Sequence, residues 1–116
     1  MTDMAQKDKC LTLVHHARRR MDMRWAEMRA IIEKAGVQNP EAFTTYNDFK
    51  DFKAYLDDEE GFAERIGYDT NLAEKAKERV DGLFRMCDYE IGRWKDKQSA
   101  VKDDRLNTLL GLNSPF

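Results

Sequence analysis

Residues 10–32 read CLTLVHHARRRMDMRWAEMRAII, and the spacing of the apolar side chains in this stretch decides the fold class. These side chains recur every three or four residues, at Cys10, Val14, Ala17, Met21, Trp25, Met28 and Ile32. At about 100° per residue they fall within an arc of about 80°, which is typical of one face of an amphipathic helix. Gly36 follows as a natural helix stop. The pattern predicts a long helix over about residues 3–35.

A second apolar stripe of the same kind occupies the C-terminal half of the chain. Its members are Leu72, Ala76, Val80, Leu83, Cys87, Ile91, Trp94, Gln98 and Val101. They predict a second long helix over about residues 70–102, with Asn71 and Glu74 at capping-box spacing and Asp69 and Thr70 as alternative caps. Both stripes repeat every eleven residues, a period close to that of a straight helix.

Two helices of about 30 residues are each about 45 Å long, whereas a compact domain of this size has a radius of gyration near 13 Å. We therefore expect a single all-α domain that forms an elongated helical hairpin or bundle, with the two long helices antiparallel. A short helical connector is expected over about residues 39–66. A short Leu-rich helix is expected over about residues 104–111, near the C-terminus.

Composition and motifs favour binding over chemistry. The 116 residues contain no long apolar run, so we expect no membrane contact and a cytoplasmic protein. Cys10 and Cys87 lack zinc spacing and fall on the apolar stripes, which predicts two small buried side chains. His15 and His16 are adjacent and point in different directions on a helix, so we expect no metal site. No phosphate loop or nucleophile motif is found, and we expect no cofactor and no enzymatic activity.

The negative charge is concentrated in the middle of the chain. Residues 38–70 hold nine Asp/Glu against three Lys/Arg. On a helical wheel Tyr55 lies away from the apolar face of the connector, and it is surrounded by the carboxylates of Asp48, Asp51, Asp58 and Glu59. The simpler interpretation of this row is a solvated helix face. The functional interpretation is a contact surface for a protein partner with a basic surface, because Tyr and carboxylates together suit Arg and Lys side chains.

Two further hypotheses remain open. In one of them, the protein is a structural subunit that forms homo-oligomers, with possible contacts at Arg20, Arg24, Tyr89, Leu106, Leu109 and Leu110. Alternatively, Arg20 and Arg24 contribute to an accessory nucleic-acid-binding surface. The arginines of residues 18–20 point about 100° apart and the sequence pI is about 5.7, so we expect no direct nucleic-acid binding. The hypothesis that we rank above these two is the one from the acidic face: the protein is a binding module or inhibitor that uses the surface around Tyr55.

Overall fold

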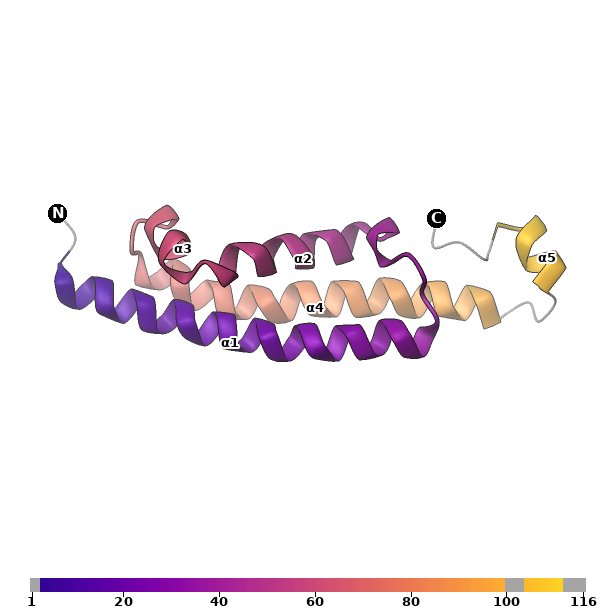
Figure 1. Ribbon diagram of the computed structural model, residues 1–116, viewed down its shortest axis with the longest axis horizontal. Coiled ribbons are helices and arrows are strands. Elements are labelled where there is room, and N and C mark those ends of the chain that lie inside the picture. The colour runs from indigo at the N-terminus through magenta and orange to yellow at the C-terminus, as the bar shows by residue number, and fades with distance from the viewer. Residues whose placement is uncertain (1–2, 100–103, 112–116) are drawn as a thin grey trace.

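A computed structural model describes residues 3–99 and 104–111, and the all-α elongated bundle expected from the sequence is confirmed (Figure 1). Its elements are α1 (Met4–Ala35), the 3-10 turn η1 (Pro40–Ala42), α2 (Thr44–Asp57), α3 (Glu59–Arg65), α4 (Thr70–Ser99) and α5 (Asp104–Leu109). The molecule measures 63 × 18 × 17 Å and its radius of gyration is 18.1 Å. It is therefore a rod, well extended beyond the roughly 13 Å radius of a compact domain.

The long helices begin and end at residues suited to those positions. The Asp3 carboxylate accepts a hydrogen bond from the Ala5 amide at the start of α1, and Gly36 ends that helix with a positive φ of 76°. At the start of α4, the Asp69 carboxylate accepts hydrogen bonds from the amides of Asn71 (2.8 Å) and Leu72 (3.3 Å). Asp69 is thus the N-cap, whereas Asn71, which fits the capping-box spacing, lies inside the helix.

The relative direction of the two long helices differs from the expectation. Contacts between them join Arg20 to Asp81 and Met28 to Cys87, and Gln6 near the start of α1 donates to the carbonyl of Tyr68, just before α4. Both members of each pair advance together along the chain, so α1 and α4 are parallel. The physical reason is the connector, because α2 and α3 together are long enough to return the chain to the end where α1 began (Figure 1). The molecule is an up-down-up bundle whose middle helix is broken.

The core lies along the seam between α1, α4 and the returning α2. Phe49 is fully buried, and its ring lies 5.7 Å from that of Trp25 and 6.2 Å from that of Phe84. Phe43 precedes α2 but is also buried, edge-on to Trp94. These contacts explain most of the aromatic side chains in the acidic connector: they fix α2 in the groove between the long helices.

The ends of the second apolar stripe depart from the expectation. Leu72 is 44% exposed, and its neighbour Ala73 is buried against α1 instead. The expected position of Val101 and the end of the second helix at residue 102 lie outside the described residues. Beyond them, α5 lies past the end of the bundle, with its leucines exposed (Figure 1). Among the described helices, none has a stretch both long and apolar enough to span a bilayer.

Candidate binding face

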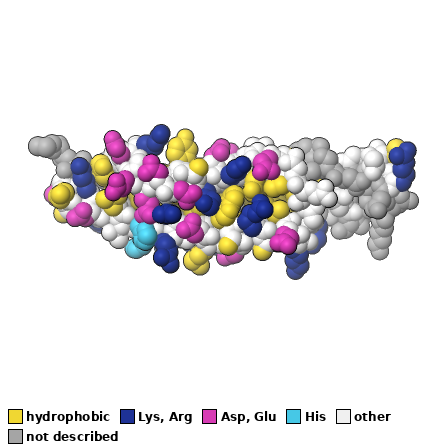
Figure 2. All heavy atoms as spheres, in the orientation of Figure 1, with side chains coloured by type: hydrophobic (Ala, Val, Ile, Leu, Met, Phe, Trp, Pro, Cys, Tyr) yellow, Lys and Arg dark blue, Asp and Glu magenta, His cyan; other side chains and the backbone are white. Residues whose placement is uncertain are grey.

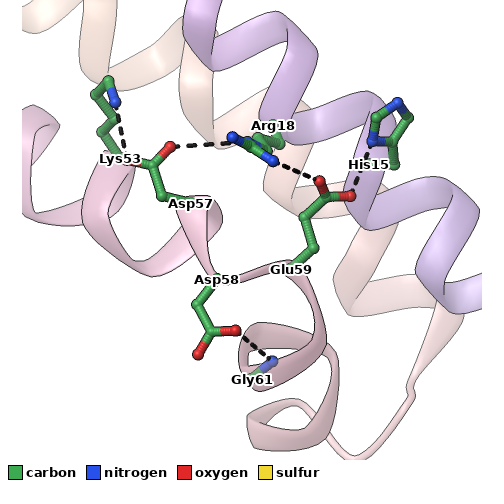
Figure 3. A network of polar contacts seen from close by, with 7 residues as sticks. All are labelled: His15, Arg18, Lys53, Asp57, Asp58, Glu59 and Gly61. Atoms are coloured by element: carbon green, nitrogen blue, oxygen red, sulfur yellow. Dashed lines mark hydrogen bonds and ion pairs between the residues drawn. The ribbon is translucent and has the colours of Figure 1, made fainter.

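The connector breaks at Asp58, and this break arranges the acidic side chains. Asp58 leaves the helical conformation (φ −99°, ψ 81°), and its carboxylate accepts a hydrogen bond from the amide of Gly61, which caps α3 (Figure 3). A Cβ at position 61 would lie only 2.1 Å from Asp58 Oδ2, so any other residue there would push the Asp58 carboxylate out of this capping position. The residues before and after Asp58 therefore belong to two separate helices, whose side chains point in different directions.

One set of acidic groups, Asp57 and Glu59, pairs with cations of the same chain and ties the break to α1. Arg18 Nη1 donates to Glu59 Oε2 at 2.9 Å, and His15 Nδ1 lies 2.9 Å from Glu59 Oε1 (Figure 3). Arg18 also lies 3.8 Å from Asp57, which accepts a hydrogen bond from Lys53 at 2.8 Å. Partial burial by itself raises the pKa of Glu59, but hydrogen bonds from Arg18 and His15 outweigh it and leave that pKa below its usual value.

Glu59 therefore serves the fold. Its side chain is only 22% exposed, and both carboxylate oxygens are engaged with α1. The helical wheel placed Glu59 beside Tyr55 because it treated the connector as one continuous helix. The break at Asp58 turns Glu59 inward, so we leave it out of the candidate face.

A second set of acidic groups faces outward around Tyr55. We call it the acidic bank and define it as Asp48, Asp51 and Asp58. All three are exposed, and Tyr55 between them is 51% exposed. Asp48 and Asp51 form no ion pair or hydrogen bond with the described residues. The structure therefore brings together four of the five residues expected at the partner-binding face.

The surface around Tyr55 is hollowed, and the positively charged side chain of Arg65 lines the hollow. A depression of about 520 Å³ is lined by Asp51, Ala54, Tyr55, Asp58, Phe62 and Arg65. The Arg65 guanidinium lies 5.4 Å from the centre of the Tyr55 ring, which shows that this ring accepts a guanidinium on its face. Sequence reasoning missed Arg65, because only the break at Asp58 brings it back from the next helix to Tyr55.

An apolar groove runs beside the acidic bank, between α2–α3 and α4. Its volume is about 490 Å³, and Phe62 lines both this groove and the depression at Tyr55. The other lining residues are Phe52, Ile66, Leu72, Lys75, Ala76, Glu78, Arg79 and Gly82. Lys75 and Arg79 are exposed, and neither forms an ion pair with a described residue. We call these two residues the basic bank of the groove.

The arginines that suggested oligomer or nucleic-acid contacts are engaged within the chain. Arg20 donates to both Asp81 oxygens at 2.9 and 3.1 Å, and Arg24 Nε donates to Asp81 at 3.0 Å. Hydrogen bonds from Arg20, and then from Arg24, lower the pKa of Asp81 despite its partial burial. These groups join α1 to α4 and leave less positive charge for phosphates or a second copy.

The other expected oligomer contacts remain at the surface. Tyr89 is 67% exposed, with the Arg93 guanidinium 5.9 Å from its ring centre. Leu106, Leu109 and Leu110 are 45–65% exposed. In the view of Figure 2, acidic, basic and hydrophobic side chains are intermingled along the bundle instead of forming one block of either charge.

The two cysteine thiols are free and buried. Cys10 and Cys87 are buried, as expected, and Cys87 Sγ lies 3.5 Å from Met28 Sδ. Burial raises the pKa of Cys87 to about 12, which keeps it a thiol at neutral pH. Within residues 3–99 and 104–111 no group of three or more His, Cys, Asp or Glu side chains is arranged to hold a metal ion.

Comparison of the chain with protein-family models, with curated proteins and with solved structures finds no match. Function is therefore inferred from geometry and charge.

Proposed function

We propose that this protein is a non-enzymatic binding module or inhibitor that engages a basic surface of a macromolecular partner through the acidic bank and Tyr55. The observation that supports it is the contrast between the two sets of carboxylates on α2 and α3. Asp57 and Glu59 are paired with cations of the same chain, whereas Asp48 and Asp51 are left unpaired beside a half-exposed tyrosine.

The chemistry of this face suits an Arg-rich or Lys-rich partner. Unpaired carboxylates accept charge-assisted hydrogen bonds, and they steer a positively charged surface before contact. Tyr55 adds a rigid ring that already receives the Arg65 guanidinium on its face. A protein surface rich in Arg and Lys is also one that binds nucleic-acid phosphates, so occupying it is a simple way to inhibit such binding.

The test is a charge reversal with a matched control. Immobilised wild-type protein is compared with Asp48→Lys/Asp51→Lys and with Asp22→Lys/Glu33→Lys, and bound proteins are identified by mass spectrometry. The side chains of Asp22 and Glu33 are exposed on α1 and form no hydrogen bond or ion pair with the described residues. Each double variant replaces two acidic residues with lysines, so both change the net charge equally. A partner should be retained by wild type and control and lost from the α2 variant. Equal recovery on all three would overturn the proposal.

A second candidate function is self-association through the Leu-rich C-terminal helix. The supporting observation is the exposure of Leu106 and Leu109 on α5 and of Leu110 directly after it, beyond the end of the bundle. This function predicts a mass that rises with concentration and falls to that of a monomer when residues 106–116 are removed. A dimer that survives this truncation unchanged counts against it.

A further inference from the structure

We infer that the basic surface that the acidic bank meets is the α4 side of the same groove in a second copy of this chain. The inference rests on the proposed function and names its partner. It predicts a symmetric dimer in which the two apolar grooves face each other, with the two-fold axis parallel to the long axis of the bundle.

The first step in the argument is the charge on the two sides of the groove. On α2, Asp48 and Tyr55 lie within about 60° of Phe52, on the side turned away from the core, and Asp51 lies about 100° from it. Asp48 is thus the carboxylate of α2 nearest to the groove, and Asp51 lies farther out. On α4, Lys75 and Arg79 line the opposite side. Glu78 also lines that side and reduces its positive charge without cancelling it. One side of the groove is thus negative, the other is positive, and the apolar floor lies between them.

The second step is that this groove is complementary to itself. A two-fold axis along the groove places the acidic bank of one copy opposite the basic bank of the other, and it does so twice. A two-fold axis across the groove would instead place like charges opposite each other, which is strongly unfavourable. Charge therefore selects the axis parallel to the bundle.

The third step concerns the position of each charged residue along the long axis of the bundle. Contacts between α2 and α4 pair Thr45 with Glu90 and Phe49 with Phe84, which fixes an antiparallel register between these helices. In this register Tyr55 lies level with residues 78–80. A two-fold axis parallel to the bundle keeps each level unchanged. Tyr55 of one copy therefore meets Arg79 of the other, and Asp58 meets Lys75. Asp51 lies level with residues 82–84, about one helical turn from Arg79.

The fourth step concerns the apolar surface and its area. Phe52, Phe62 and Ile66 are only partly buried within one chain, and Leu72 is 44% exposed. The α2–α3 segment runs for about 33 Å at 1.5 Å per residue, and the rod is 18 Å wide. Contact over the whole of this face would bury at most about 600 Å² per copy, or about 1,200 Å² in total, which reaches only the lower end of the range for specific interfaces. The same axis places both α5 helices at one end of the dimer.

The experiment measures mass by sedimentation velocity over a range of concentrations for wild type and two charge reversals. Asp48→Lys/Asp51→Lys and Arg79→Glu should each weaken the dimer by more than about tenfold, because like charges then meet in both halves of the interface. An equimolar mixture of the two variants should form a mixed dimer of near wild-type affinity, because every contact again joins opposite charges. Asp22→Lys/Glu33→Lys should leave the dimer intact, and so should removal of residues 106–116.

Three results would overturn the inference. The wild-type protein could be a monomer at all concentrations, a charge-reversal variant could dimerise as tightly as wild type, or the mixture of variants could fail to form a dimer. None of these results by itself contradicts the proposed function. A different protein that is captured by wild type and lost only from the α2 variant would still support the binding face.

Discussion

Asp81 is the residue whose removal tests the electrostatic connection between α1 and α4. Its carboxylate accepts three hydrogen bonds from two arginines, and its side chain is 23% exposed, against 34% for Arg20 and 24% for Arg24. Hydrogen bonds to charged groups contribute about 1.5–3 kcal/mol when well buried, and exposed ion pairs contribute less than about 1 kcal/mol. For this partly buried cluster we expect Asp81→Ala to lower the free energy of unfolding by about 1–2 kcal/mol.

The assay is thermal and urea unfolding followed by circular dichroism. At about 4 °C per kcal/mol for a domain of this size, the melting temperature should fall by about 4–8 °C. Asp88→Ala is the matched control, because Asp88 is exposed on the same helix and forms no hydrogen bond or ion pair with the described residues. Equal stability of the two variants would refute the reasoning and show that Arg20 and Arg24 find other partners at no cost.

The remaining predictions concern acid stability, packing and thiol reactivity. The pKa of Asp81 is lowered in the folded protein, so its contribution is complete above the ordinary Asp pKa and is lost as the pH falls through the folded value. The stability difference between wild type and Asp81→Asn, measured by urea unfolding, should therefore shrink from pH 6 to about pH 2; a constant difference would contradict this. Phe49→Ala should cost about 3–5 kcal/mol in urea unfolding, because Phe49 is fully buried against two rings; the partly buried Phe52→Ala should cost clearly less. Cys87, with a pKa of about 12, should resist alkylation at pH 8 until the protein unfolds, and rapid labelling of the native protein would show that α2 opens.

Much of the fold follows from the periodicity of the sequence. Apolar residues at three- and four-residue steps predict both long helices, and the stripe from Cys10 to Ile32 is buried except for the half-buried Trp25. Periodicity cannot give the direction of packing. That depends on whether the connector crosses the bundle, and the antiparallel expectation was wrong because α2 and α3 together do cross it.

The candidate site could be predicted in part for a similar reason. A helical wheel places Asp48, Asp51 and Tyr55 on one outward side, since all three belong to α2. The helical wheel fails beyond Asp58, because the Asp58 carboxylate caps the Gly61 amide and a new helix begins there. In this new helix Glu59 points inward and pairs with Arg18. The groove and its basic bank require the register between α2 and α4, and no local pattern contains that information.

The up-down-up path has a mechanical consequence. Met4 and Ser99 lie at opposite ends of the rod, because the chain runs its length three times (Figure 1). A pulling force between these points loads the seam between α1 and α4 in shear, so that many side-chain contacts must yield together. A two-helix hairpin has both ends on one side and unzips one turn after another. This bundle should therefore resist stretching along its axis more strongly than its modest core suggests.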